Sequence, residues 1–159
     1  MRRKDREVTS PDEIAAILAA SNVCRVAWQG ETYPYIVPLN YGFTHENGRF
    51  TLYFHCAQEG EKLKHTRRNP RVAFEVDGAH AIRGQESACS YTMEYESVTG
   101  HGILTEVEAS GREAGMQLLM RQIVPGKAFT FTPNDLAHVT VLRLDVESIS
   151  GKRNRKANA

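Results

Sequence analysis

The strongest structural signal in the sequence is a tight turn at Asn47 and Gly48, because an Asn-Gly pair favours the two-residue turn of a β-hairpin. Directly after it, in residues 49–55, Phe50, Leu52 and Phe54 alternate with polar or aromatic neighbours. A period of two is typical of a strand that buries one face. The chain is therefore predicted to build antiparallel β structure around this hairpin.

Two prolines constrain the β-rich run that precedes the turn. Pro34 and Pro38 interrupt residues 33–43, and each proline removes a backbone donor from a strand ladder. A central strand paired on both sides would not tolerate them. We expect a strand with one free edge, facing something other than another strand.

The rest of the chain supplies further strands and a few helices. Strands are predicted at residues 23–28, 72–76, 90–107 (one strand or two, bent at Gly100 and Gly102) and 138–149; helices at 11–18, 59–68 and 113–124; polar loops at 79–89 and 125–135. Six or seven strands linked mostly by hairpins predict a mainly β fold, a small antiparallel barrel with flanking helices. Periodicity alone does not distinguish this barrel from a sandwich.

Composition limits the class of protein. The 159 residues, 41% hydrophobic and 25% charged, fit a single domain over residues 1–159, with basic tails at 1–9 and 151–159 that we expect to be solvated. A net charge of +1 gives no reason to expect nucleic acid as a partner, and no apolar run suggests a membrane span or a signal peptide. Three widely spaced cysteines form neither a disulfide framework nor a metal knuckle, which favours a reducing cytoplasm.

Residues 54–70, which join a predicted strand end to a predicted helix start, carry the most chemistry. The N-terminus of a helix presents unpaired N–H groups and partial positive charge, Gly60 allows a ligand to approach the backbone, and Lys62 falls in the first turn. These features suit an anion such as phosphate. On the residues alone, an ordinary surface loop with solvated lysines accounts for the segment at least as well.

His55, at the end of the predicted strand, is a candidate catalytic residue because an imidazole titrates near neutral pH. A histidine at a strand end is also often a simple hydrogen-bonded residue at a barrel mouth. The other five histidines show no metal-ligand spacing, so no metal site is predicted.

Four motifs, taken in order, carry a resemblance to a known family. They are residues 33–41, residues 52–57, residues 60–62 followed by Asn69-Pro70, and residues 88–93. In these motifs the chain resembles the FMN-binding split-barrel proteins related to pyridoxamine 5'-phosphate oxidase, and within them the branch of nitroimidazole-resistance proteins. The resemblance extends over nearly the whole chain.

The resemblance implies a split-barrel homodimer that binds FMN in clefts between the two subunits. The residues implied at the cofactor are Val37, Pro38, Leu39 and Asn40 along the ring, His55, Cys56 and Ala57 beside the ring and ribityl chain, and Gly60, Glu61 and Lys62 at the phosphate. Cys89 and Ser90, and also Gly151 and Lys152, are implied to approach from the partner subunit.

The activity implied is reduction of a small electron-poor acceptor, such as a 5-nitroimidazole taken from nitro to amine, with reduced FMN as the donor and His55 orienting the acceptor or supplying a proton. The oxidase itself carries arginine and lysine on the strand that matches residues 37–41, which is uncharged here and argues against vitamin B6 oxidation. Two alternatives remain open: a non-catalytic flavin or haem carrier or redox sensor, and a split barrel with another cofactor such as a deazaflavin. Lys62 beside Gly60 suits a terminal phosphate and favours FMN.

Overall fold

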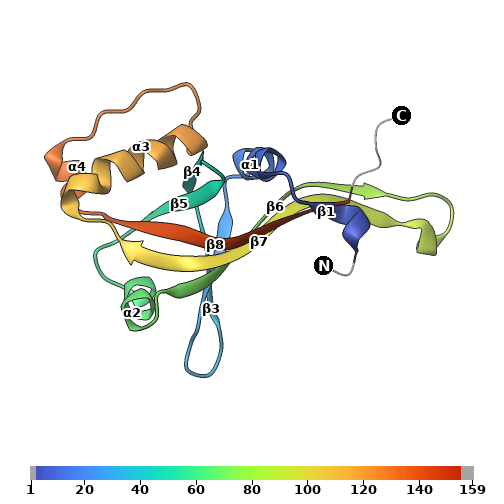
Figure 1. Cartoon of the computed structure of the whole chain (residues 1–159), viewed down its shortest axis with the longest axis horizontal. Helices are drawn as coiled ribbons and strands as arrows, with labels where there is room; N and C mark the ends of the chain where they lie inside the picture. The colour runs from blue at the N-terminus through green and yellow to red at the C-terminus, as the bar shows by residue number, and fades with distance from the viewer. Residues whose placement is uncertain (1–2, 155–159) are drawn as a thin grey trace.

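The computed structural model describes residues 3–154, which form one antiparallel sheet of eight strands (Figure 1). Within this range the strand order is β3-β2-β6-β7-β8-β5-β4, and β1 pairs with β8 off this path. The strands are β1 (Glu7–Val8), β2 (Cys24–Trp28), β3 (Tyr35–Leu39), β4 (Gly42–Glu46), β5 (Arg49–Cys56), β6 (Arg71–Arg83), β7 (Thr92–Glu106) and β8 (Thr140–Asn154).

The two outermost strands of this sheet are neighbours in the sequence. β3 and β4 are joined only by Asn40 and Tyr41, so the sheet has to curl until its opposite edges approach each other. In the described part of the chain β3 and β4 do not pair, which leaves the barrel split along this seam. The prediction of an antiparallel barrel with flanking helices is confirmed.

The predicted hairpin joins β4 to β5. Asn47 and Gly48 both have positive φ angles, 51° and 75°, as the tight hairpin turn requires. The last ladder pair is Glu46 opposite Arg49. Along β5 the side chains of Phe50, Leu52 and Phe54 are buried, as their alternation predicts.

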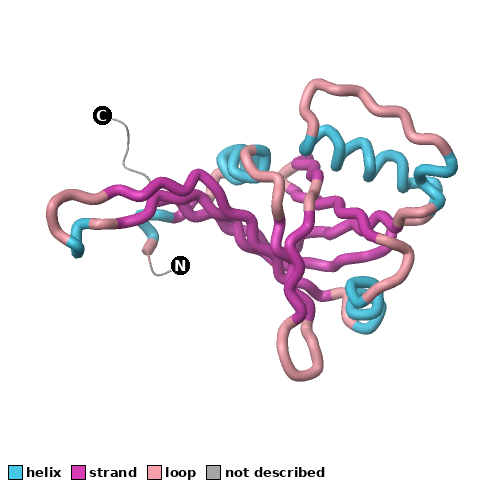
Figure 2. The backbone as a smooth tube through the Cα atoms, turned by 180° about the vertical axis from the view of Figure 1, so that it is seen from behind, coloured by secondary structure: helices cyan, strands magenta, loops and turns pink. Residues whose placement is uncertain are grey.

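The helices lie outside the sheet (Figures 1 and 2). They are α1 (Pro11–Ala19), α2 (Glu61–Arg68), α3 (Arg112–Ile123) and α4 (Pro133–Ala137), with short 3₁₀ turns at Lys4–Arg6, Ala88–Ser90 and Ala109–Gly111. α3 packs closely on β4, because a Cβ on Gly42 would lie only 2.4 Å from the backbone of Leu118. No helix in residues 3–154 combines the length and apolar content needed to cross a bilayer.

The core fills the curl of the sheet. Trp28, Tyr41 and Phe54 are its largest fully buried side chains, and Ile14, Ile17 and Leu18 of α1 cover it from outside. The buried hydroxyl of Tyr41 donates a hydrogen bond of 2.6 Å to the Leu18 carbonyl. This bond satisfies the polar end of a side chain that is otherwise apolar.

The prediction that β6 stops before residue 79 is wrong. The strand continues to Arg83 through an irregularity between Gly78 and Ala81, where Ala79 has a φ of 54°. Residues 79–83 pair with β7 alone and form a hairpin that extends beyond the core. Because neither face of this hairpin is buried, these residues are exposed and show no apolar alternation. β7 is one strand whose register shifts at His101 and Gly102.

The prediction of solvated tails is wrong for the parts that pair in the sheet, whereas Arg3 and Lys4 are exposed as predicted. Glu7 and Val8 of β1 pair with Lys152 and Gly151 of β8, and Gly151 is buried. The sequence gives no sign of β1, because its pairing with β8 depends on backbone groups and the side chains around it are mostly charged. Residues 155–159, with Arg155 and Lys156, and Arg2 lie outside the described residues.

One short helix, α4, begins inside the predicted loop at 125–135 and ends beyond it, at Ala137. The Thr132 hydroxyl accepts a bond from the Asp135 N–H, and the Asp135 carboxylate accepts one from the Thr132 N–H. This reciprocal capping box stabilises a helix too short to show apolar periodicity.

Candidate functional site

The end of β5 and the start of α2 form the strand-to-helix junction expected from the sequence. Gly60 is the N-cap residue that directly precedes α2, and its φ of 140° is a conformation that residues with a Cβ rarely adopt. Nothing lies within 4 Å of the position where its Cβ would be, so the approach to this end of the helix is open. Among the described residues no side chain caps α2, which leaves its first N–H groups available to an anion.

Lys62 brings positive charge to this junction. Partial burial and the charge of Lys62 together hold the pKa of His55 below its ordinary value. Burial raises the pKa of the Cys56 thiol, and the charges of Lys62 and Arg67 oppose that rise. The structure therefore brings His55, Cys56 and Lys62 close to one another, and their role at a cofactor stays a prediction.

Cys56 has little chemistry to offer in this position. Its side chain is buried, and its raised pKa keeps the thiol protonated at neutral pH, whereas a nucleophilic cysteine needs a lowered one. The nearby Arg67 is occupied by Glu106, through bonds of 2.6 and 3.0 Å. Of the two cations near His55 and Cys56, Arg67 is paired with Glu106, whereas Lys62 forms no ion pair with a described residue.

Two hydrogen bonds fix the backbone of Lys62. The buried Trp28 indole N–H of β2 donates to the Thr66 hydroxyl at 2.9 Å, and that hydroxyl donates to the Lys62 carbonyl at 2.8 Å. Leu63 is buried beside them. The first turn of α2 is therefore held against the sheet rather than left as a mobile surface turn.

Glu61 behaves differently from the expectation that it holds a phosphate. Its carboxylate accepts a hydrogen bond of 2.7 Å from the Lys64 ammonium, and this bond, together with the charge of Lys64, lowers the pKa of Glu61. A carboxylate repels a phosphate, so only the backbone N–H of Glu61 suits one.

β3 is an edge strand, as Pro38 within it and Pro34 just before it predict. It pairs with β2 alone among the described strands, and Pro38 lies opposite Arg25. Val37 and Leu39 pack toward the core while Pro38 is exposed. The free edge leaves backbone groups along residues 36–40 for a ligand, and Asn40 is fixed by a bond of 2.9 Å to the Asn22 carbonyl.

The end of β5 also has an open side. β4 begins at Gly42, opposite Tyr53, so Phe54, His55 and Cys56 have no partner in β4 and pair only with β8 within the described sheet. Ala57 follows in an exposed loop. The open edge of β3 and the open end of β5 therefore border the same split in the barrel, next to α2.

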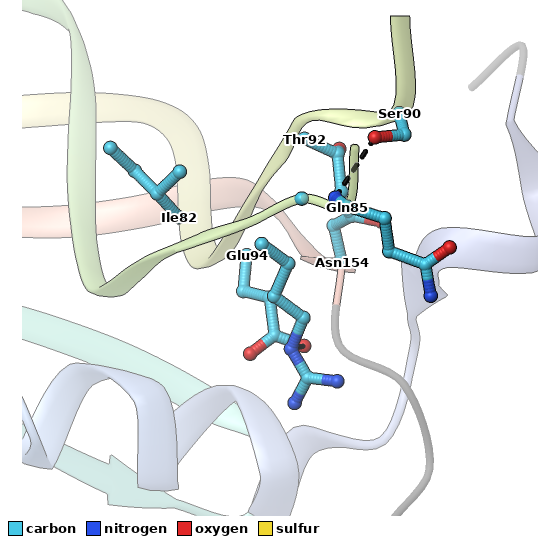
Figure 3. A pocket seen from close by; sticks show the side chains of 8 residues that line it. Ile82, Gln85, Ser90, Thr92, Glu94 and Asn154 are labelled. Atoms are coloured by element: carbon cyan, nitrogen blue, oxygen red, sulfur yellow. Dashed lines mark hydrogen bonds and ion pairs between the residues drawn. The ribbon is translucent and has the colours of Figure 1, made fainter. Parts of the chain in front are cut away.

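Cys89 and Ser90 lie elsewhere. They form a short turn at the tip of the β6–β7 hairpin, at the opposite end of the long axis from α2 (Figures 1 and 2). There the Ser90 hydroxyl accepts a bond from the Gln85 N–H at 2.9 Å and so braces the tip (Figure 3). Within one chain these residues do not reach the junction, nor do Gly151 and Lys152, which pair in β8.

A cleft beside the β5–α2 junction was not predicted from the sequence. A cleft of about 580 Å³ separates α2 from the loop between β2 and β3, and it is lined in part by Tyr33, Tyr35, Lys64, His65 and Arg68. His65 and Arg68 lie three residues apart on one helix face, which is the only sign of the cleft in the sequence.

Comparison with known proteins relates most of the chain to one family. Residues 10–153 match the model of the pyridoxamine 5'-phosphate oxidase family. Among curated proteins none matches the sequence.

Several solved structures share the fold. A Bacteroides thetaiotaomicron protein to which 5-nitroimidazole antibiotic resistance has been ascribed is 26% identical, with a TM-score of 0.80 over 92% of this chain and 86% of its own. The FAD- and haem-binding protein of Mycobacterium smegmatis is 19% identical, with a TM-score of 0.82 over 97% of this chain and 77% of its own. An FAD-binding protein of Mesorhizobium loti is 22% identical, with a TM-score of 0.65 over 94% and 98%.

The extent of the family match and the shared split-barrel fold agree with the arrangement of β3, β5 and α2 described above. This chain belongs to the pyridoxamine 5'-phosphate oxidase family.

Proposed function

We propose that this chain binds a flavin through its 5'-phosphate, as FMN or as the FMN half of FAD, and uses it to reduce small electron-poor acceptors. The observation that carries the proposal is the junction of β5 and α2, where an uncapped helix start, an open Gly60 and the cation of Lys62 meet. Relatives described as FAD-binding proteins and one linked to nitroimidazole resistance support it.

The residues present fit such a ligand. The phosphate would accept bonds from the first N–H groups of α2 and from Lys62. The ring would lie along the free edge of β3, where the backbone of Val37, Leu39 and Asn40 is close to the split. The strand is uncharged, so we do not propose oxidation of a phosphorylated pyridoxine.

A bound flavin would supply hydride transfer to an electron-poor group, such as the nitro group of a 5-nitroimidazole on its way to an amine. His55 is our candidate catalytic residue. Its lowered pKa keeps the imidazole neutral at pH 7, so it can donate one hydrogen bond and accept another while it orients the acceptor. Its place at the end of β5 puts it at the open side of the split.

We also propose a homodimer in which Cys89 and Ser90 of one subunit border the flavin of the other. The hairpin that carries them exposes Ile82, Tyr91 and Met93, more apolar surface than an isolated hairpin tip needs. Light scattering should give twice the 17.8 kDa of one chain. A monomer that still binds flavin would remove the partner from the site.

Three free cysteines fit the reducing cytoplasm that we propose as the compartment.

The test of flavin binding is a titration of the purified protein with FMN, followed by visible absorption. Lys62→Ala should weaken FMN binding by roughly 1.5–3 kcal/mol, the range for a hydrogen bond to a charged group. Lys127→Ala, an exposed lysine on the loop after α3, is the matched control and should bind as the wild type does. A protein that takes up no flavin would overturn the proposal, and a haem Soret band without flavin would favour the haem carrier instead.

Turnover separates a reductase from a flavin carrier. With NAD(P)H under anaerobic conditions, the wild type should reduce nitro compounds, and His55→Ala should slow this reduction sharply while flavin remains bound. Wild-type turnover in His55→Ala would remove His55 from the mechanism. Bound flavin without turnover on any electron-poor acceptor would favour the carrier.

A further inference from the structure

The cleft beside the β5–α2 junction carries chemistry that the proposed phosphate and ring contacts do not use. It lies between α2 and the β2–β3 loop, which projects from the sheet next to the helix (Figure 1). Its loop side presents Tyr33 and Tyr35, and its helix side presents Lys64, His65 and Arg68. Its volume of about 580 Å³ is typical of a site that holds a small organic molecule.

The floor of the cleft is a fixed aromatic surface. The His65 ring stacks on the Tyr35 ring, with centroids 4.8 Å apart and planes 16° apart. The Tyr35 ring in turn lies 5.6 Å from the ring of the buried Trp28, and Trp28 is hydrogen-bonded to Thr66 of α2. A planar ligand would therefore meet a surface that is already formed.

Tyr33 provides a second aromatic wall. The residue is 81% exposed, although the loop that carries it is tightly built. A Cβ on Gly30 would lie 1.9 Å from the Tyr33 carbonyl oxygen, so glycine is needed for this close approach. The loop therefore holds an exposed ring beside the cleft, where it can stack on a flat ligand.

The rim carries two cations whose partners a ligand can replace. Lys64 pairs with Glu61 and Arg68 pairs with Glu31, each at 2.7 Å, and all four side chains are exposed. Exposed ion pairs contribute little net free energy, so a ligand carboxylate can take the place of either glutamate at small cost. The guanidinium of Arg68 is also shaped to hold a carboxylate through two parallel hydrogen bonds.

The cleft borders the proposed flavin site on two sides. Tyr35 precedes Val37 by two residues, or about 7 Å, in β3, and both side chains pack toward the core, so they share one face of the strand. Glu61, which follows Gly60 at the start of α2, also lines the cleft. A ligand anchored at the rim can therefore extend along β3 toward the flavin ring and the split that His55 borders.

We propose that this cleft binds the acceptor of the reductase, and that the acceptor is a planar aromatic carboxylate. The inference rests on the proposed flavin function and names its substrate class. The aromatic walls select a flat ring, and Lys64 and Arg68 select a negative charge on it. A neutral acceptor such as a 5-nitroimidazole meets only the first of these requirements.

With an aromatic nitro compound as the probe, the reaction can be written in full. The nitro group takes up a hydride and a proton, loses one oxygen as water and becomes a nitroso group. A second hydride and proton give the hydroxylamine, and a third pair releases the other oxygen as water and leaves the amine. NAD(P)H replaces each hydride through the flavin, and the carboxylate at the rim is unchanged.

The first arm of the test compares 4-nitrobenzoate with its neutral isostere 4-nitrobenzamide in anaerobic turnover by protein loaded with FMN. The amide withdraws electrons more strongly, so a preference for the benzoate has to come from binding. The wild type should show a KM for the benzoate about tenfold lower than for the benzamide, because the carboxylate adds charge-assisted bonds.

The Arg68→Ala variant should remove this difference by raising the KM for 4-nitrobenzoate alone, with both kcat values unchanged. Arg121→Ala on α3 is the control for loss of an exposed arginine and should behave as the wild type does.

The second arm measures binding without turnover, by calorimetric titration of 4-nitrobenzoate into protein loaded with FMN in the absence of NAD(P)H. Tyr33→Ala should weaken this binding, and Tyr33→Phe, which keeps the ring, should retain it. Neither variant should change the affinity for FMN. A lower FMN affinity in Tyr33→Ala would assign the cleft to the cofactor and overturn the inference.

The remaining outcomes separate this inference from the proposed function. Equal KM values for the two probes in the wild type would overturn the inference and leave the reductase standing. Tighter binding of 4-nitrophenyl phosphate than of 4-nitrobenzoate, with both weakened by Arg68→Ala, would assign the rim to a phosphate and overturn the carboxylate. Failure to bind flavin, or to reduce either probe, would overturn the proposed function itself.

Discussion

Lys62 contributes to the lowered pKa of His55, and this can be measured without any ligand. Partial burial of the imidazole and, after it, the charge of Lys62 both disfavour the imidazolium, so the pKa of His55 is lowered. Lys62→Gln removes the charge and should raise that pKa toward its ordinary value. Following the His55 ring protons by NMR across the pH range gives the answer.

The control for this titration is Lys127→Gln, which removes a lysine from the loop after α3 and should leave His55 unchanged. An unchanged His55 pKa in Lys62→Gln would mean that burial alone lowers it. The lowered pKa also makes stability depend on pH. Because His55 is harder to protonate in the folded state than in the unfolded state, the free energy of unfolding should decrease as the pH falls below the unfolded pKa of about 6.5.

At the scale of elements, α2 depends on one buried hydroxyl. Thr66 accepts from Trp28 and donates to the Lys62 carbonyl, so it ties the helix to β2. Thr66→Val keeps the shape but leaves the buried indole N–H without its acceptor, which should lower the free energy of unfolding by about 1–3 kcal/mol. Urea unfolding measures the loss.

Thr66→Ser restores the hydroxyl and should recover most of that stability. If Thr66→Val unfolds at the same urea concentration as the wild type, the bond to Trp28 contributes nothing net. Flavin affinity provides a second readout, because a loosened first turn would also misplace Lys62.

Elements that bury one face were predictable from the sequence, and elements held by backbone pairing alone were not. β5 and α1 follow from Phe50, Leu52 and Leu18, which repeat at strand or helix spacing. The outer half of β6 does not, because Ile82 and its neighbours are exposed and the strand exists only through β7.

In the candidate site, too, only the residues that are close together in the sequence could be predicted to lie near one another. His55, Gly60 and Lys62 are close in sequence, so local reasoning could place them together. Tyr35 and His65 meet only because β3 pairs with β2 and α2 packs over Trp28, contacts that no short sequence window contains. The far position of Cys89 likewise follows from the length of the β6–β7 hairpin.

At the scale of the whole molecule, the end of β8 joins parts of the chain that are far apart in sequence. Arg153 donates to Glu96 of β7 and to Glu13 of α1, each at 2.6 Å. Both bonds raise its pKa, and the carboxylate of Glu96 is largely buried. A basic residue that looks like part of a solvated tail therefore connects α1 to the sheet.

Replacing Arg153 tests whether this connection stabilises the fold. Arg153→Met keeps the length of the side chain but removes its charge beside a buried carboxylate, and should lower the free energy of unfolding by roughly 1–3 kcal/mol, less than for a fully buried pair. Arg143→Met is the matched control, since it breaks an exposed pair with Asp145 in the same strand and should cost under about 1 kcal/mol. Equal urea midpoints for the two variants would show that Arg153 is no more than the surface residue that the sequence suggests.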